Sequence, residues 1–283
     1  MVSCVVNIVG DLALVGGFGL GVGGAAFATA AAMMLAWAFS ILYLLRRVPE
    51  LRFPVLPAGH DRETLREILH VGVPLGLNNA LYSFGHLLLQ TLYNTQGSVF
   101  VAGCSVASKL SSLANIAITS FSSAASVFSG QNFGAGLTDR LRKGALRIPL
   151  CCGAFTLACG LLLTVFGRPV LGLFTRDAAV LAVAERYVFV VLPFTWCYAV
   201  FNGIMNYLNG LGEIRYPTFV NLLILWGVRI PAAWGLAAVG LGGWAMAGIS
   251  LSFIAGMIAM LPYYRTHRWQ ELCEQCERNR DKM

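Results

Sequence analysis

The chain has 283 residues, of which 57% are hydrophobic and only 12% are charged, and its formal net charge is +7. A soluble domain carries about twice that share of charged residues. The composition therefore excludes an ordinary soluble protein and, with a mean hydropathy of +0.70, indicates a multi-pass membrane protein. Because the basic residues gather in the links between apolar runs, the positive charge is typical of membrane loops and does not indicate nucleic-acid binding.

The apolar runs are long and do not alternate, which favours membrane-spanning helices. Helices also satisfy every backbone polar group internally, as a lipid environment requires. We expect an all-α polytopic membrane protein with about eight transmembrane helices. The expected segments are 1–16, 20–45, 68–95, 99–129, 142–166, 180–208, 216–238 and 241–264.

The first segment carries Asn7 and Asp11 four residues apart, in otherwise apolar company. Residues at this spacing project from one face of a helix. An Asp within the membrane is costly and marks a functional site by default. Carboxylate and amide oxygens are the ligands that hard cations prefer, so the pair predicts a cation site. One alternative stays open: Asp11 caps the helix after GGFGLG or hydrogen-bonds a neighbour.

The links between the segments alternate between many and few basic residues. Those at 46–66 and 140–147 and the tail at 265–283 are rich in Arg and Lys. We therefore expect the link after Arg47 and the C-terminus to be cytoplasmic and the chain to lie in the plasma membrane. Residues 62–67, with Asp61 as the N-cap, are expected to form a short interfacial helix before the third span.

Polar residues recur at helical spacing on the third, fourth and sixth segments. On the fourth, small polar residues from Ser105 to Ser129 form one continuous face. Such a face either lets helices pack closely or lines a cavity, and both interpretations stay open. Amide, phenol and imidazole groups exceed the needs of packing, so we expect a shared substrate pathway. Its members are Asn79, Tyr82, His86, Gln90, Asn115, Asn202 and Asn206.

Related stretches at the two ends of the chain predict an internal repeat. FGLGVGGAAFA from residue 18 aligns with VGLGGWAMAGI from residue 239, which pairs Gly19 with Gly240. The repeat implies two six-helix halves of the same orientation. The second half is complete and the first contains only its last two helices, so about four helices are expected to be missing from the front. The resulting divisions are 1–47 for the end of the first lobe, 48–67 for a cytoplasmic linker, 68–266 for the six-helix second lobe and 267–283 for a polar tail.

Enzyme and metal motifs are sparse. Cys273 and Cys276 form a CxxC near His267, which gives three ligands where structural zinc needs four, so we expect reduced thiols and no metal there. We find no HExxH, P-loop or Ser-His-Asp arrangement. The sequence therefore predicts neither an enzyme nor an ATP-driven transporter, and no cofactor.

Four stretches resemble the MATE (multidrug and toxic compound extrusion) family of transporters. They are GVPLGLNNALYSFGHLLLQTLYNTQG at 72, GQNFGAG at 130, LNGLGEIRYP at 208 and WGVRIPAAWGLAAVGLGGWA at 226. The resemblance implies two six-helix lobes around a cavity. It also implies export of small organic cations or drugs, driven by Na⁺ or H⁺, with a small-molecule substrate, lipid contact and no obligate protein partner.

The same resemblance implies site residues. Asn7, Asp11 and Thr29 match part of a first-lobe cation site, whose other Asp lies on a helix that precedes this sequence. Tyr82 and Tyr198 stand where some members have second-lobe acids, so a second coupling carboxylate is not expected. Two alternatives remain: a flippase for lipid-linked substrates, which needs a broader basic cavity, and a fragment that does not transport.

Overall fold

The computed structural model describes residues 2–47 and 62–265, with the side chains of several residues in 62–75 and 263–265 left out. By its internal contacts the chain divides into unit 1, Met1–Ile68, and unit 2, Leu69–Met283. The predicted Asp61 cap and the Cys273, Cys276 and His267 group lie outside the described residues. All regular secondary structure in the described ranges is helical.

Unit 1 is built around a pair of helices. The first, α1 (Val2–Asp11), continues into a π-helical turn, η1 (Leu12–Gly17), and the second is α2 (Gly21–Arg47). The two pack closely because small residues face each other: a Cβ on Gly10 would lie 3.0 Å from the Cβ of Ala28. Gly19 takes φ +63° in the turn between the helices, a conformation that favours glycine.

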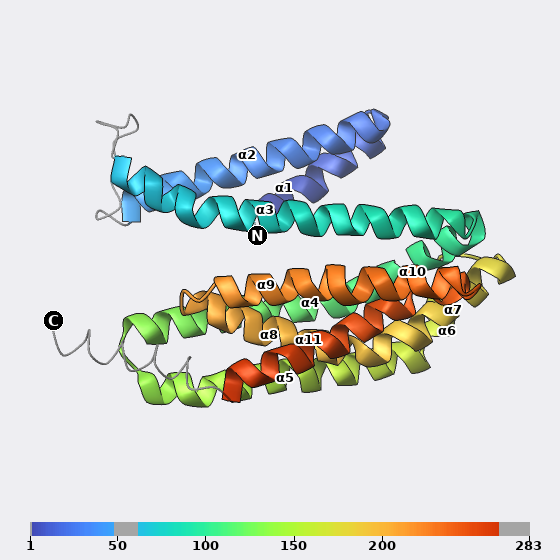
Figure 1. Ribbon diagram of the computed structural model, residues 1–283. Helices are drawn as coiled ribbons and strands as arrows, with labels where there is room; N and C mark the ends of the chain where they lie inside the picture. The colour runs from blue at the N-terminus through green and yellow to red at the C-terminus, as the bar shows by residue number, and fades with distance from the viewer. Residues whose placement is uncertain (1, 48–61, 266–283) are drawn as a thin grey trace. The chain divides into compact units, whose positions relative to one another are not determined.

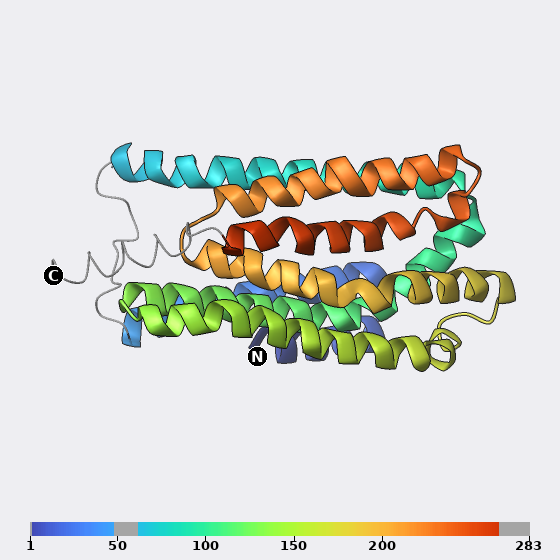
Figure 2. The same cartoon turned by 60° about the horizontal axis from the view of Figure 1, so that its bottom comes forward.

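Unit 2 contains the remaining helices, except that the first turns of α3 fall in unit 1 (Figure 1). In chain order they are α3 (Arg62–Thr95), α4 (Ser98–Gly134), α5 (Thr138–Val165), α6 (Gly167–Leu171), α7 (Ala178–Val191), η3 (Leu192–Phe194), α8 (Thr195–Gly210), α9 (Arg215–Ile224), η4 (Leu225–Arg229), α10 (Ile230–Ala238), η5 (Gly242–Trp244) and α11 (Ala247–Arg265). In Figure 2, α11 lies between α8 on one side and α9 on the other.

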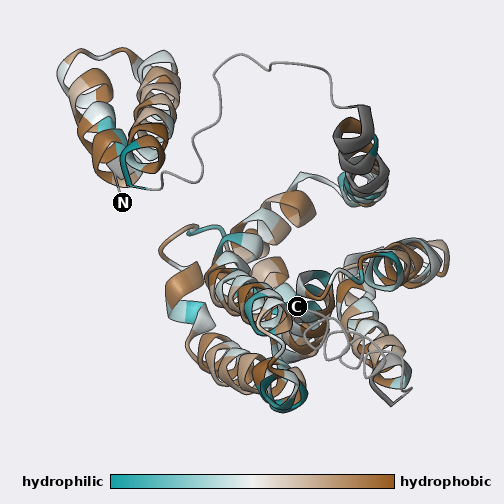
Figure 3. Cartoon of the chain, turned by 90° about the vertical axis from the view of Figure 1, so that its left-hand side faces the viewer, coloured by the Kyte–Doolittle hydropathy of each residue, from teal (hydrophilic) through white to brown (hydrophobic). Residues whose placement is uncertain are grey.

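The prediction of an all-α polytopic membrane protein is confirmed. Five helical stretches in the described part of the chain are long and apolar enough to cross a membrane: 21–47, 98–134, 138–165, 178–210 and 215–238. The stretches at 3–17 and 247–262 are apolar but shorter. Hydrophobic residues recur along helices of both units, with hydrophilic ones among them (Figure 3). Helix α3 is not among the five long apolar stretches, because its amides and His86 lower its hydrophobicity. Residues 62–67 form no separate interfacial helix but are the first turns of α3.

Prolines interrupt two of the predicted spans. The span expected at 180–208 is broken by η3, which contains Pro193, and the span at 216–238 has the π-helical η4 directly before Pro231. Proline has no N–H to donate to the preceding turn, so the helix tightens or widens locally there. This places Arg229, the last residue of η4, in an irregular part of the helix.

The polar face of α4 is used in both of the ways that the sequence left open. Towards its end Ser122 and Ser129 are buried, and a Cβ on Gly210 of α8 would collide with Ser129, so this part serves close packing. Nearer its start, Ser105 and Ser108 are exposed. The helix ends at Gly134, and Gly136 takes φ +67°, so the glycines of GQNFGAG stop the helix and turn the chain.

Candidate functional site

In unit 1, two of the three predicted cation ligands are in direct contact. Asn7 Nδ2 on α1 donates a hydrogen bond to Thr29 Oγ1 on α2 over 3.2 Å. The Thr29 hydroxyl in turn donates to the carbonyl oxygen of Ala25 over 2.9 Å. This orientation uses the amide nitrogen of Asn7 and leaves its carbonyl oxygen available as an acceptor.

Asp11 lies at the junction of α1 and η1. Its Oδ1 atom is buried and has no hydrogen-bond partner among the described residues. The carboxylate makes no capping bond to the π-helical turn that follows. A buried acceptor that lacks a partner costs about 1–3 kcal/mol, and more when it is charged.

The donor set in unit 1 fits a proton or a hard cation. Asp11 contributes a carboxylate, Asn7 an amide oxygen and Thr29 a hydroxyl oxygen, and hard cations prefer oxygen ligands. A proton would instead neutralise Asp11 and satisfy its buried oxygen. The set is too small to complete a cation's coordination shell, which normally holds about six oxygens. No cluster of three His, Cys, Asp or Glu side chains suited to a metal occurs in the described parts of the chain.

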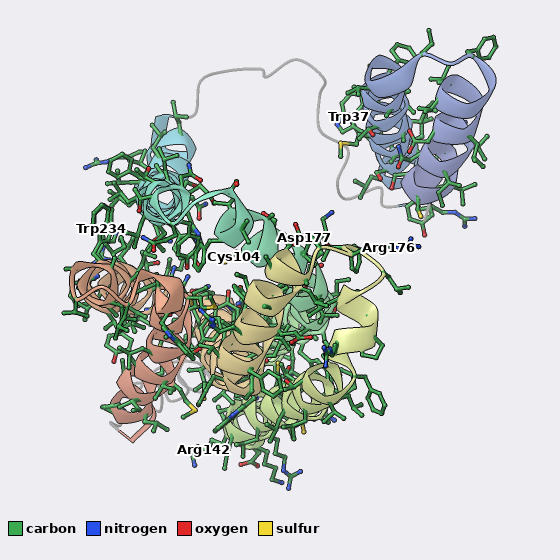
Figure 4. The ribbon with its side chains drawn as sticks, turned by 90° about the vertical axis from the view of Figure 1, so that its right-hand side faces the viewer. Trp37, Cys104, Arg142, Arg176, Asp177 and Trp234 are labelled. Carbon is green, nitrogen blue, oxygen red and sulfur yellow. The ribbon has the colours of Figure 1, made fainter. Side chains whose placement is uncertain are left out.

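In unit 2, a cavity of about 210 Å³ opens between α3, α4, α7, η4 and α11. It brings together His86 and Gln90, two predicted pathway residues. Ser105 and Ser108 of the α4 face line it as well. The full lining is His86, Leu89, Gln90, Tyr93, Val101, Cys104, Ser105, Ser108, Tyr187, Arg229 and Ile249. In Figure 4, Cys104 lies on the inner side of unit 2, whereas Arg142 and Trp234 lie at its periphery.

Arg229 is the most unusual residue of this cavity, because only 8% of its surface is exposed. Its Nε donates a hydrogen bond to Ser252 Oγ on α11 over 2.8 Å. The Ser252 hydroxyl donates onward to the Ile249 carbonyl oxygen. The guanidinium carbon also lies 5.4 Å from the centre of the Phe253 ring, within the range of a cation–π contact. Arg229 thus lies where α11 packs on η4.

The other predicted pathway residues do not share this cavity. Tyr82 lies in a smaller neighbouring cavity with Tyr198 and Arg229. Asn206 donates its amide N–H to Asn202 Oδ1 over 2.8 Å, so these two residues bond to each other. The remaining two, Asn79 and Asn115, are exposed and line neither cavity. The structure thus places the predicted pathway residues in two neighbouring cavities and outside them, and the pathway itself stays a prediction.

Three lining residues, Tyr93, Tyr187 and Arg229, were missing from the predicted pathway. Arg229 carried a usable signal, because a lone Arg inside an apolar run is rare and functional by default. Tyr93 also carried a signal, because it follows Gln90 by three residues on the same helix face. Tyr187 carried none, since a phenol in a membrane helix is equally at home in a packed core.

The comparisons with known proteins decide the family. The profile of the MatE family matches residues 74–234, which is more than half of the chain. The chain belongs to the MATE family. The predicted resemblance is thereby confirmed, and the cavity lies in the part of this MATE chain that extends from α3 to α11.

Relatives and solved structures agree with this family. The probable multidrug resistance protein YoeA of Bacillus subtilis is 27% identical over 283 residues, which cover 94% of this chain and 59% of YoeA. The multidrug export protein MepA of Staphylococcus aureus is 26% identical over 227 residues, which cover 79% of this chain and 49% of MepA. A crystal structure of a mutant of the Vibrio cholerae MATE transporter VcmN matches with a TM-score of 0.84 at 23% identity, over 96% of this chain and 62% of VcmN.

Proposed function

We propose that this MATE chain takes part in the export of small organic compounds, as a cation-coupled antiporter in the cytoplasmic membrane. The support comes from family membership, from relatives named as multidrug resistance and multidrug export proteins, and from the polar cavity in an apolar helical unit. Organic cations and drugs are the proposed substrates, and the C-terminus is proposed to be cytoplasmic. The chain spans 59% of YoeA, so the activity of a whole transporter is part of the proposal.

The coupling ion is proposed to bind at Asp11, with Asn7 and Thr29 as neighbours. The observation that carries this assignment is the buried Oδ1 of Asp11, which has no partner among the described residues. Either Na⁺ or H⁺ would satisfy it. Binding of the ion would then change the charge between α1 and α2, and alternating access would follow from movement of the two lobes.

A transport assay with a matched control tests the proposal. The chain is reconstituted in liposomes, and movement of ethidium is followed by fluorescence under a Na⁺ or an H⁺ gradient. We expect gradient-dependent transport that Asp11→Asn abolishes. Asp177→Asn is the control, because Asp177 caps α7 through Ala179 N and Asn caps a helix equally well. Equal transport by both variants would refute the ion site, and no gradient-dependent transport by the unsubstituted chain would refute the function.

The flippase alternative gains no specific support. It requires a broadly basic cavity, but Arg229 is the only Lys or Arg among the described residues that line the cavity. Lys109, one turn from Ser105, is exposed and lies 5.7 Å from the centre of the Phe174 ring.

A further inference from the structure

The guanidinium of Arg229 has unused hydrogen-bond donors. An Arg side chain carries five N–H donors and no acceptor. Within the described residues the recorded hydrogen bond uses Nε alone, towards Ser252. The terminal nitrogens therefore keep their four donors, and the residue lines both the larger cavity and its small neighbour.

Among the described residues of unit 2, no carboxylate pairs with Arg229. The acidic side chains that the structure describes in unit 2 are Asp139, Asp177, Glu185 and Glu213. All but Glu185 lie in a link between helices, next to one, or in the first turn of a helix. Glu185 is bonded to Arg168, with Nε and Oε1 2.9 Å apart. A buried cation within a membrane is costly unless an anion compensates it. The cavity thus has a positive charge that the described residues of unit 2 do not neutralise.

The cavity around this charge is suited to accept an anion. Ser105 and Tyr93 bring hydroxyl donors to its wall, and its lining includes no carboxylate from the described residues. Its volume of about 210 Å³ is below the roughly 300–1,000 Å³ of drug-sized pockets. It therefore suits an inorganic anion or the acidic group of a larger compound.

The internal repeat gives an independent reason to regard Arg229 as part of a binding site. With the spacing that pairs Gly19 with Gly240, Arg229 corresponds to Ile8, next to Asn7 and one turn from Asp11. The paired glycines both have left-handed φ angles, +63° and +78°, which supports that register. The corresponding helices of the two halves thus carry opposite charges at nearly corresponding sequence positions.

We propose that the cavity at Arg229 is an anion-binding subsite that takes a small monovalent anion, either chloride or the carboxylate group of an anionic or zwitterionic organic substrate. This proposal rests on the proposed function in one respect: it assumes that the cavity belongs to the substrate pathway. An Arg fork and a carboxylate form two parallel, charge-assisted hydrogen bonds. Asp11 would then bind the coupling cation in one half and Arg229 an anion in the other.

Three probes of the same shape and different charge test the proposal. Radiolabelled benzoate, benzamide and benzamidine are negative, neutral and positive, and their equilibrium binding is measured to the purified chain in nanodiscs of zwitterionic lipid. We expect benzoate to bind at least about tenfold more tightly than benzamide, and benzamidine to bind most weakly. Benzoate binding no tighter than benzamide would overturn the proposal.

Matched variants identify the residue responsible. Arg229→Gln should bring the benzoate preference to about one. Arg186→Gln should leave it unchanged, because Arg186 is exposed and stacks 5.1 Å from the Trp244 ring. Arg229→Lys keeps the charge but loses the planar pair of donors, so it should retain a weaker preference for benzoate. This variant also provides a test if Arg229→Gln does not fold. The assignment would be overturned if a folded Arg229→Gln chain kept the full preference for benzoate over benzamide. It would also be overturned if Arg229→Lys kept the same preference as Arg186→Gln and the unsubstituted chain.

Competition by chloride at constant ionic strength distinguishes the two anion sources. Displacement of benzoate assigns the subsite to inorganic chloride, and no displacement assigns it to organic carboxylates. Because the assay measures binding alone, it separates the two proposals. Benzoate preference without ethidium transport contradicts only the proposed function, whereas ethidium transport without benzoate preference contradicts only the anion subsite.

Discussion

Asn7 on α1 and Thr29 on α2 are joined by a hydrogen bond of 3.2 Å, in which the amide N–H donates to the hydroxyl oxygen. The bond holds the two helices of unit 1 in register beside Asp11. Because Thr29 also donates to Ala25, its hydroxyl is part of a chain that a valine cannot replace.

Thr29→Val should therefore weaken ion binding at Asp11, whereas Thr29→Ser should preserve it. A ligand that binds only the folded chain raises the melting temperature. We expect the shift in Tm produced by Na⁺ over choline, or by low over high pH if the ion is H⁺, to fall in Thr29→Val and to remain in Thr29→Ser. The same shift in both variants would show that the hydroxyl does not contribute.

Gly103 of α4 is predicted to be a sensitive packing position. A Cβ there would lie 2.6 Å from the Val183 side chain and 2.9 Å from the Val180 carbonyl oxygen. Gly103→Ala should destabilise the chain by about 1–3 kcal/mol through overpacking.

Gly235 of α10 provides the control, because a Cβ there meets nothing within 4 Å and Ala is the better helix former. Thermal unfolding in detergent should show a lower Tm for Gly103→Ala and an unchanged or higher Tm for Gly235→Ala. The reverse order would contradict the α4–α7 packing.

Tyr207 of α8 supplies a buried hydrogen bond between helices. Its hydroxyl donates to the Leu141 carbonyl oxygen on α5 over 2.7 Å, and only 1% of the residue is exposed. Tyr207→Phe should reduce stability by about 1 kcal/mol, the net value of such a bond. The exposed Tyr43, changed to Phe, should have no measurable effect in the same unfolding experiment. Equal effects of the two changes would argue against the bond.

Ser105 tests whether the cavity of unit 2 contains water. In a chain whose native cysteines are replaced by serine, Ser105→Cys should react with a charged, water-soluble thiol reagent, because Ser105 lines the cavity. Leu161→Cys on α5 is also exposed in the structure, but an apolar outer face would lie against lipid and should react far more slowly. Comparable labelling rates at the two positions would exclude a distinct wet cavity.

The sequence alone established the helical class and the family. Length and apolarity identify a membrane helix because transfer into lipid is a local property of each segment. A turn at a glycine is equally local: Gly136, the last residue of GQNFGAG, takes a left-handed φ and needs no distant partner to do so. Asp11 is a candidate, and stays a prediction, for the related reason that a carboxylate in an apolar run is costly wherever its neighbours lie.

The tertiary structure decided which polar residues share a space. Asn206 donates a hydrogen bond to Asn202, a pairing that the list of predicted pathway residues did not include. Ser129 is buried against Gly210, while Ser105 lines a cavity on the same helix. Periodicity defines a helix face, but whether that face meets another helix or a cavity depends on residues far apart in the chain. Arg229 was visible in the sequence as a charge, and only the packing of η4 on α11 showed that Ser252 holds it beside the cavity.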